Sequence, residues 1–426
     1  MTIDNLYQIF LRYPSIQTDT RKLRVGDLYF ALKGPNFNGN NFAHKAIESG
    51  AAYAVIDDAA CAINDKTILV DDVLQTLQHL ALHHRRQFTI PFLAITGSNG
   101  KTTTKELVHA VLSTTFITCT TEGNLNNHIG VPLTLLKIKS DAEMAVIEMG
   151  ANHIGEIASY CEYTLPTHGL ITNVGKAHLE GFGGEAGVRK GKGELFDYLR
   201  GNGGTVFLMN DYRYLHEMSE GIKEVFTYGT NDGDITGDAV KSDPFLQVSF
   251  IKGFDDEIRT ALVGMYNLPN VLAAVAVGKF FGVEDKKIRS AIEDYTPSNS
   301  RSQLVQKESN TIILDAYNAN PSSMKAAIEN FAKAEANSKI LVLGAMAELG
   351  EESHSEHKAI IEEISRHQWR HVLLVGGDFA KTSHSYLSFS TPEAAGEWLK
   401  TANITNSSLL IKGSRSIAME KVLNYV

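Results

Sequence analysis

The 426-residue chain has few cysteines, no long apolar run and no cluster of basic residues. Its three cysteines, Cys61, Cys119 and Cys161, are widely spaced and odd in number. That pattern excludes a disulfide framework and a cysteine-rich metal site, and it favours a reducing compartment. Because no stretch of about 18 apolar residues is present, we expect no membrane insertion. Polar residues interrupt residues 1–10, which argues against a secretion signal and predicts a cytoplasmic protein.

The charge of the chain indicates which kinds of ligand it can bind. The formal net charge is −9, and no basic block occurs along the chain. A nucleic-acid backbone needs a basic stripe on its partner, so nucleic acid is excluded as the main ligand, whereas single lysines can still bind small anions. We expect a monomer that acts on small molecules.

Strand-like and helix-like segments alternate along the chain, which predicts an α/β fold with three domains. Residues 1–86 are expected to form a small α/β domain. Residues 87–297 are expected to form a central ATPase-like domain with a mostly parallel sheet and helices on both faces. Residues 298–426 restart the pattern and predict a Rossmann-like, doubly wound domain.

A glycine-rich turn at residues 97–104 is the strongest motif. It follows an apolar run at 91–95, typical of a buried strand, and precedes a helical pattern at 106–112. Such a turn aims backbone N–H groups at a phosphate, where Lys101 and the Thr102 hydroxyl would face the phosphates and Mg²⁺. The general P-loop spacing would put its first glycine at Ile95, so this loop is shorter.

Further polar residues lie in or after predicted strands. Glu148 and Asn173 end two strands, so both are expected in one crevice with Gly97. Glu148 suits a hard cation, or alternatively caps the next helix. A lone histidine such as His178 is more often a structural residue than a ligand. Lys192, between two glycines in a helical pattern, indicates close packing, a modified side chain or a solvated face.

Longer stretches resemble a known family. Residues 97–103 resemble the short P-loop of the Mur ligase family, which accounts for the missing first glycine. Residues 121–132, 148–153 and 173–180 are similar to its MurF branch. Residues 315–324 discriminate best, because they are unlike the branches that add meso-diaminopimelate or lysine. Residues 347–350 and 412–416 also match, so the resemblance spans all three domains.

The resemblance implies an ATP-dependent ligase that joins D-alanyl-D-alanine to UDP-N-acetylmuramoyl-tripeptide in peptidoglycan precursor synthesis, with ATP and Mg²⁺ as cofactors. The nucleotide-binding residues that it implies are Gly97, Ser98, Asn99, Gly100, Lys101, Thr102, Thr103, Asn267, Asn270, Arg301 and Asp315. The implied catalytic residues are Lys101, Glu148, His178 and Lys192, and the implied metal ligands are Thr102, Glu148, His178 and Lys192.

Lys192 resembles the family's carbamylated lysine. The implied substrate contacts are Thr20 and Arg21 for the UDP group, with Asn124, Asn126, Asn127, Tyr317, Asn318 and Asn320. The chain departs from the family pattern at three positions. Tyr266 replaces a usual His, Ala345 a common Asp, and Thr20 a usual Ser whose hydroxyl it keeps.

The implied chemistry is carboxylate activation. Transfer of the γ-phosphoryl group of ATP makes an acyl phosphate, which the dipeptide amine then attacks. A folylpolyglutamate-type ligase or another Mur-type amino-acid ligase is the alternative within this class. A nucleotide-binding regulator without turnover is the alternative outside the enzymes. The joint presence of Lys101, Glu148, His178 and Lys192 argues against such a regulator.

Overall fold

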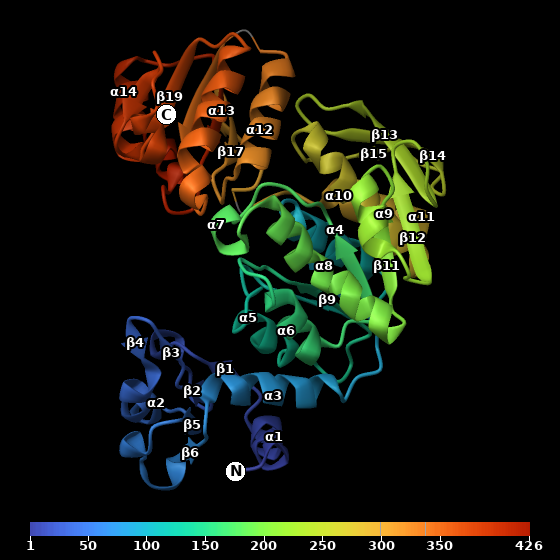
Figure 1. Ribbon diagram of the computed structural model, residues 1–426, viewed down its shortest axis with the longest axis vertical. Coiled ribbons are helices and arrows are strands. Elements are labelled where there is room, and N and C mark those ends of the chain that lie inside the picture. Colours follow the sequence, from blue (N-terminus) through green and yellow to red (C-terminus); the bar gives the residue numbers. More distant parts are fainter. Residues whose placement is uncertain (299, 337) are drawn as a thin grey trace. The chain divides into compact units, whose positions relative to one another are not determined.

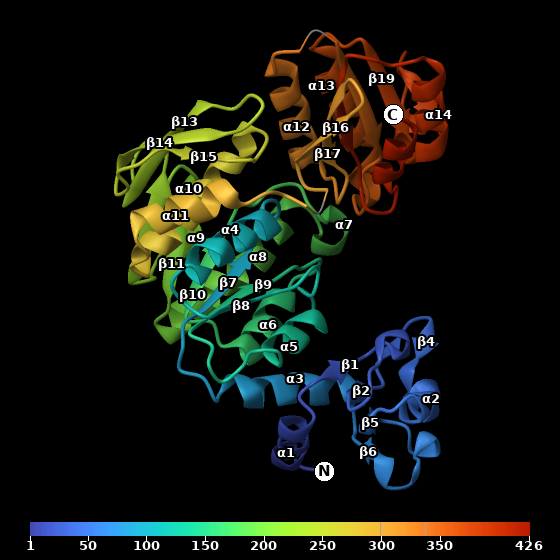
Figure 2. The ribbon, with the colours of Figure 1, turned by 180° about the vertical axis from the view of Figure 1, so that it is seen from behind.

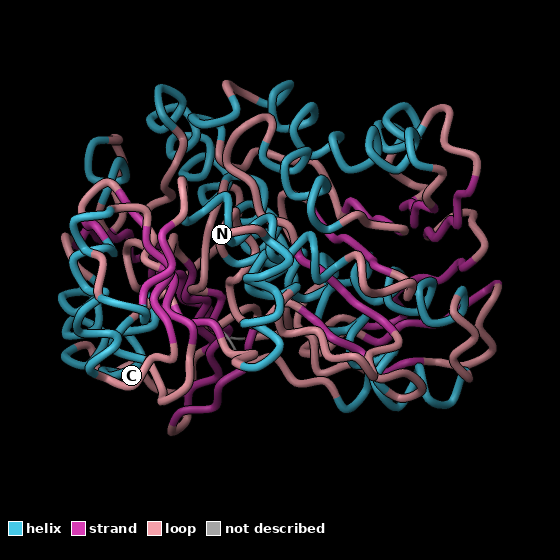
Figure 3. The backbone as a smooth tube through the Cα atoms, turned by 90° about the horizontal axis from the view of Figure 1, so that it is seen from below, coloured by secondary structure: helices cyan, strands magenta, loops and turns pink. Residues whose placement is uncertain are grey.

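The computed structural model describes residues 1–298, 300–336 and 338–426 (Figure 1). Helices and strands alternate along most of the chain (Figure 3), which confirms the predicted α/β class. The chain divides into two compact units. The first contains Met1–Ala94, Phe116–Gly150 and Glu156–His168, and the second contains Ile95–Thr115, Ala151–Gly155 and Gly169–Val426. Each of the three predicted domain ranges contains one large sheet.

The first sheet, in the first unit, has four parallel strands in the order β1-β2-β5-β6. Their bounds are Ile16–Gln17, Leu28–Phe30, Tyr53–Ile56 and Thr67–Leu69. The helices of this region are α1 (Ile3–Arg12), α2 (Ala43–Glu48) and α3 (Val73–Arg85). Tyr29, Ala54 and Ile56 pack against alanines of α2, so the apolar strand residues form the core as predicted.

One polar segment of this region is more ordered than its composition suggests. Residues 36–41 include β4 (Phe37–Asn38), paired with β3 (Lys33–Gly34), and most of a short 3₁₀ helix at Gly39–Phe42. Tyr29 donates a hydrogen bond from its hydroxyl to the carbonyl of Gly39 at 3.0 Å. That tertiary contact orders a segment whose composition is typical of a loop.

The second sheet has nine strands in the order β15-β14-β13-β12-β11-β10-β7-β9-β8. In chain order, β7 to β15 span Phe92–Thr96, Thr118–Thr120, Met144–Glu148, His168–Ile171, Thr205–Met209, Glu224–Gly229, Ile235–Lys241, Gln247–Lys252 and Ile258–Arg259. Helices α4 to α11 span Lys101–Ser113, Gly130–Leu135, Glu156–Thr164, Leu179–Phe182, Glu185–Asn202, Arg213–Ser219, Leu268–Phe280 and Asp285–Asp294.

The expected alternation of strand and helix holds for this sheet only in part. The pairs β8–β9, β11–β12 and β12–β13 are parallel, whereas β13–β14 and β14–β15 are antiparallel hairpin pairs. Short polar turns connect these last strands and leave no room for a crossover helix. In the second unit, α8 and α9 lie in front of the strands in Figure 1 and α10 and α11 in Figure 2, so helices cover both faces.

The third sheet, in the second unit, has the order β16-β17-β21-β18-β19-β20. Strands β16 to β21 span Gln303–Lys307, Asn310–Asp315, Lys339–Gly344, His371–Val375, Leu387–Phe389 and Ser408–Lys412. Only β16–β17 is an antiparallel pair. Helices α12 (Pro321–Lys333), α13 (Ser353–Ser365) and α14 (Pro392–Thr401) complete it.

Apolar residues on both faces of the strands explain why helices pack on both sides of this sheet. Ile312 and Leu314 pack with Leu399 of α14 and with Met419 and Val422 near the C-terminus. Successive residues of a strand point to opposite faces, so Ile313 and its neighbours face the other layer. The buried residues of α12, such as Met324 and Ile328, supply the apolar surface for that layer.

No helix among the described residues has the length and apolar content to cross a membrane.

Arg85, the last residue of α3, makes several structural contacts in the first unit. Its side chain is 6% exposed and donates hydrogen bonds to the carbonyls of Thr164, Leu165 and Phe88 at 2.7, 2.8 and 2.8 Å. Its guanidinium also lies 3.6 Å from the ring centroid of Phe92. The Arg85 side chain thus connects α3 with β7 and with the end of α6.

We predict that Arg85→Met destabilises this unit by roughly 2–4 kcal/mol, because one buried and two partly buried carbonyls lose their donor. The measurement is hydrogen exchange of α3 and β7 together with thermal melting by circular dichroism. Exposed Arg86 offers the matched control Arg86→Met. Equal protection factors in the two variants would show that the Arg85 contacts do not stabilise the unit.

Candidate active site

The turn between β7 and α4 has the geometry of a phosphate cradle. Gly97 (φ +142°) and Gly100 (φ +81°) adopt conformations that other residues rarely take. A Cβ atom at Gly97 would lie 2.0 Å from Thr172 Oγ1, and one at Gly100 would lie 2.6 Å from Asn270 Oδ1. Only glycine therefore fits at either position. Gly100 is also the N-cap of the 13-residue α4 and has no side chain with which to cap it. The positive end of this helix therefore suits an anion.

Lys101 and Thr102 occupy the first turn of α4. Lys101 Nζ donates to the carbonyl of Gly97 at 2.6 Å and to that of Ser98 at 3.4 Å, so the ammonium lies over its own loop. Thr102 is 4% exposed, and Thr103 follows it in the helix. The shape of the loop and the local charge both favour binding of nucleotide phosphate groups at these positions.

The segment after β10 holds the loop in place. Ser98 Oγ donates to the carbonyl of Gly175 and accepts from its N–H, both at 3.0 Å. The carbonyl of Asn99 accepts from Thr172 Oγ1 at 2.6 Å and from Asn173 Nδ2 at 3.0 Å. Gly97 therefore lies beside Asn173, and the shared crevice expected for Gly97, Asn173 and Glu148 stays a prediction.

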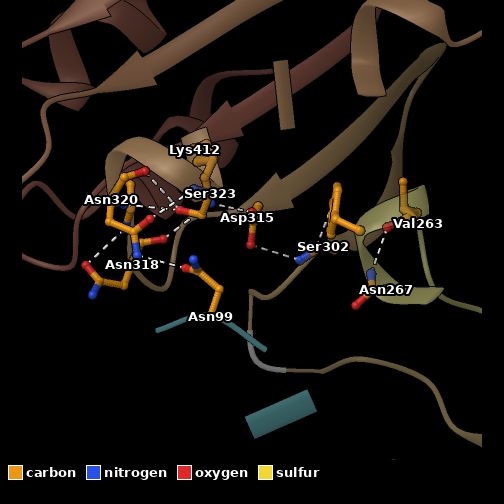
Figure 4. A network of polar contacts seen from close by, with 11 residues as sticks. Asn99, Val263, Asn267, Ser302, Asp315, Asn318, Asn320, Ser323 and Lys412 are labelled. Atoms are coloured by element: carbon orange, nitrogen blue, oxygen red, sulfur yellow. Dashed lines mark hydrogen bonds and ion pairs between the residues drawn. The ribbon is translucent and has the colours of Figure 1, made fainter. Parts of the chain in front are cut away.

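The same loop contacts the C-terminal domain. Asn320 Nδ2 donates to Asn99 Oδ1 at 2.8 Å, as Figure 4 shows. Asn320 is also the N-cap of α12, where its Oδ1 accepts from the N–H of Ser323 at 2.9 Å. Because both ends of the amide are used, the orientation of the Asn320 side chain is well determined.

Asp315 and Lys412 form a buried ion pair beside this contact. Lys412 Nζ lies 2.5 Å from Asp315 Oδ2 and donates to the carbonyl of Asn318 at 3.4 Å. Asp315 Oδ1 accepts from the N–H of Ser302 at 3.1 Å (Figure 4). The Asp315 carboxylate, expected at a ribose, is therefore oriented by two partners within its own domain.

Tyr266, which stands where the resemblance expects a His, bonds to the C-terminal domain. Its hydroxyl lies 2.9 Å from Ser302 Oγ. Burial, and secondarily the negative charge of Asp315, raises the pKa of this hydroxyl above its usual value. Tyr266 is therefore a neutral hydrogen-bonding group here, with no titration in the physiological range.

Asn267 and Asn270 support the cradle from behind. They are 3% and 6% exposed, and Asn270 Nδ2 donates to Asn267 Oδ1 at 2.9 Å. Asn270 Oδ1 accepts from Thr104 Oγ1 of α4 at 3.0 Å, and Asn267 Nδ2 donates to the carbonyl of Val263 at 2.9 Å (Figure 4). These bonds position α4, and the expected contact with a nucleotide base stays a prediction.

His178 is paired with a carboxylate of the C-terminal domain. Its Nδ1 lies 2.6 Å from Glu348 Oε2, and both residues have a positive φ, 53° and 62°. The hydrogen bond with His178 lowers the pKa of the Glu348 carboxyl below its usual value. This contact leaves Nε2 as the ring nitrogen that would face a cation.

Lys192 is fully buried in the continuous helix α8. Its Nζ donates to the carbonyl of Ala151 at 3.0 Å and lies 5.0 Å from the ring centroid of Phe182. A Cβ atom at Gly191 would lie 2.4 Å from Phe182 Cε1. Of the readings left open by the sequence, the structure confirms close packing and excludes a solvated face.

Glu148 and the asparagines of the predicted substrate loop belong to the first unit. Glu148 is 1% exposed, and its Oε1 accepts from Asn126 Nδ2 at 2.7 Å while its N–H donates to Thr121 Oγ1 at 2.9 Å. Asn127 Oδ1 accepts from the N–H groups of Ile129 and Gly130. The carbonyl of Asn124 accepts from the N–H of Asn126 at 2.8 Å. These bonds order the loop that leads into α5.

Thr20 and Arg21 lie in a short 3₁₀ helix of the N-terminal domain. Arg21 forms a paired contact with Asp19, with Nε to Oδ1 at 2.9 Å and Nη2 to Oδ2 at 2.8 Å. The Arg21 hydrogen bonds lower the pKa of Asp19 to about 2. The side chain of Arg21 is 86% exposed, so it is accessible to a ligand.

The described residues contain no group of three or more His, Cys, Asp or Glu side chains able to hold a metal ion. The expected set has only one carboxylate and one imidazole, with a hydroxyl and a lysine. Hydroxyl and carboxylate oxygens suit Mg²⁺, whereas a lysine ammonium does not.

Comparison with known proteins identifies the family. Residues 12–85 match the model of the Mur ligase family catalytic domain, residues 95–278 the Mur ligase middle domain, and residues 300–415 the Mur ligase glutamate ligase domain. A UDP-N-acetylmuramoyl-tripeptide–D-alanyl-D-alanine ligase of Escherichia coli is 37% identical, over 96% of this chain and 92% of that protein. The chain belongs to the Mur ligase family.

Solved structures place this Mur ligase in the MurF branch. MurF from Acinetobacter baumannii is 30% identical and superposes with a TM-score of 0.87, covering 96% of this chain and 92% of that one. MurF from Thermotoga maritima, solved in complex with ADP, is 27% identical with a TM-score of 0.86 and 97% coverage of both chains. The predicted family and three-domain fold are therefore confirmed.

The structure of this Mur ligase adds residues that the sequence did not single out. Thr172 supports the cradle, Glu348 pairs with His178, and Lys412 pairs with Asp315. Glu348 and Lys412 lie in stretches that resembled MurF, which was the only available signal. No local pattern pointed to Thr172.

We predict that Gly97→Ala weakens ATP binding more than tenfold, because its Cβ would displace Thr172 and open the cradle. Isothermal titration with a non-hydrolysable ATP analogue measures the affinity. The control is Gly201→Ala in α8, where a Cβ meets nothing within 4 Å. Unchanged affinity in Gly97→Ala would remove the loop from nucleotide binding.

Proposed function

We propose that this chain joins D-alanyl-D-alanine to UDP-N-acetylmuramoyl-tripeptide, at the expense of ATP, in cytoplasmic peptidoglycan precursor synthesis. The observation that carries the proposal is the match along the whole chain, with the three Mur ligase regions in order. The E. coli relative is named for this reaction. Residues 1–86, 87–297 and 298–426 would bind the UDP substrate, ATP and the incoming dipeptide, respectively.

Bound ATP supplies the phosphoryl group that turns the unreactive carboxylate of the tripeptide into an acyl phosphate. The turn at residues 97–103 would hold the phosphates, with Lys101 balancing their negative charge. Arg301, Asp315, Asn267 and Asn270 would hold the rest of the nucleotide. Asn99 and Asn320 keep the cradle and the C-terminal domain in register, which favours attack by a positioned amine over attack by water.

Thr102, Glu148, His178 and Lys192 would hold Mg²⁺, which stabilises charge that develops on phosphate oxygens. Glu348 would fix the imidazole of His178 so that one nitrogen faces the cation. The substrate groups would meet Thr20 and Arg21 in the N-terminal domain, Asn124, Asn126 and Asn127 in the central loop, and Tyr317, Asn318 and Asn320 in the C-terminal domain.

We predict that phosphate release from ATP requires the tripeptide substrate and D-alanyl-D-alanine together, and that Lys101→Ala reduces it at least a hundredfold, because the charge over the cradle is lost. The assay measures phosphate release with D-alanyl-D-alanine, with single amino acids and with folate-type acceptors. Turnover with single amino acids alone would favour the alternative ligase class. Near-normal turnover in Lys101→Ala would contradict the role of the cradle.

We propose that Lys192 is carbamylated in the active enzyme. The side chain is fully buried against Phe182, and burial disfavours a charged ammonium, so the neutral amine can react with CO₂. The carbamate would replace a positive charge by oxygen ligands for Mg²⁺.

The test combines ¹³C NMR of enzyme incubated with ¹³CO₂ and assays of Lys192→Ala with and without acetate. We expect a carbamate signal that the variant lacks, loss of most activity in the variant, and partial recovery with acetate. The exposed Lys190→Ala is the control for the NMR signal. Absence of the carbamate signal in active wild-type enzyme would disprove the modification.

A further inference from the structure

Two arginine side chains meet at one aromatic ring in the loop that follows β17. Arg301 Cζ lies 3.6 Å from the ring centroid of Tyr317, and Arg415 Cζ lies 5.5 Å from the same centroid. The ring face attracts each guanidinium. Two like charges at one ring nevertheless repel each other, and an anion bound beside them would reduce that repulsion.

The protein provides little compensating negative charge for Arg415. Its side chain is 69% exposed, and the carboxylate nearest to it, Oε1 of Glu420, is 4.0 Å away. Nε of Arg301 is buried and donates to no partner within the described part of the chain. By contrast, Lys412, three residues before Arg415, is neutralised by Asp315 at 2.5 Å. The unbalanced charge is therefore local to Arg415 and Arg301.

The position of this pair in the sheet suits a ligand. Tyr317 and Arg415 follow the carboxyl ends of β17 and β21, which are adjacent parallel strands with Asp315 opposite Lys412. Ligands of such sheets bind beyond these ends. Three residues after Tyr317, Asn320 bonds to Asn99 of the phosphate cradle. One short loop thus connects the arginine pair with the nucleotide site.

We propose that Arg415, backed by the ring of Tyr317, binds the terminal carboxylate of the incoming dipeptide. This inference rests on the proposed function, because it assumes that the second substrate is a peptide with a free amine and a free carboxylate. A planar guanidinium donates paired hydrogen bonds to a carboxylate, and the side chain is exposed enough to receive one. A nucleotide phosphate shares this anion chemistry, so the test separates the two sources.

The experiment compares D-alanyl-D-alanine with its C-terminal amide, D-alanyl-D-alaninamide, in wild-type enzyme and Arg415→Gln. We expect wild-type kcat/KM to favour the acid over the amide by about tenfold to a hundredfold, the range for a hydrogen-bonded charge pair. In Arg415→Gln this ratio falls to about one through a higher KM for the acid, while KM for ATP changes less than twofold. Arg415→Lys, which keeps a point charge, retains part of the ratio.

The exposed Arg213→Gln is the matched control and should leave both KM values unchanged, since Arg213 is 94% exposed and its ion pair is with Glu217 at the surface. An unchanged acid-to-amide ratio in Arg415→Gln would overturn the inference. So would a raised KM for ATP with an unaltered ratio, which would assign Arg415 to nucleotide phosphates. A wild-type enzyme that uses neither dipeptide would instead refute the proposed function.

A second measurement needs no variant. Phenylglyoxal modifies accessible arginines, and peptide mass spectrometry reports the extent at Arg415 in wild-type enzyme with ATP analogue present. We expect D-alanyl-D-alanine to protect Arg415 and its amide to leave the residue reactive. Equal protection by the acid and the amide would contradict a contact with the carboxylate.

Discussion

The geometry of the site depends on the hydrogen bonds of Asn99. A loop outside helices and sheets lacks their regular hydrogen bonds, so other parts of the chain must hold it. Asn99 meets this need with its carbonyl on Thr172 and Asn173, its N–H on Asn173, and its side chain on Asn320. The first contacts fix the loop to the central sheet, and the last fixes it to the C-terminal domain.

Ion pairs organise the residues around that junction. Asp315 is held by Lys412, His178 by Glu348, and the N–H and ammonium of Lys176 by Ser322 and Glu356. Each contact fixes the orientation of a side chain that could otherwise rotate. Against this background of matched charges, Arg415 beside Tyr317 is distinct, because its charge faces a place where a substrate would bring the counter-charge.

A ligase of this kind must bring three substrates together and exclude water from a reactive intermediate. In the second unit, the cradle contacts the C-terminal loop at residues 315–320 through Asn99 and Asn320, and the His178 segment contacts Ser322 and Glu348 of the same domain. Lys192 lies behind them in a packed interior that only Gly191 allows, since any larger residue would strike Phe182. The fold therefore determines the positions of the side chains for which we propose these roles.

The sequence by itself determined the features that depend on neighbouring residues. Apolar runs predicted β7 and β9, and the Gly-Lys-Thr turn predicted the cradle, because strands, turns and helix starts are set by local periodicity and glycine. Only the tertiary structure decided which distant residues meet, such as Asp315 with Lys412 or Asn99 with Asn320, and that Lys192 is buried. Such contacts depend on how sheets and helices pack, and no spacing along the chain encodes them.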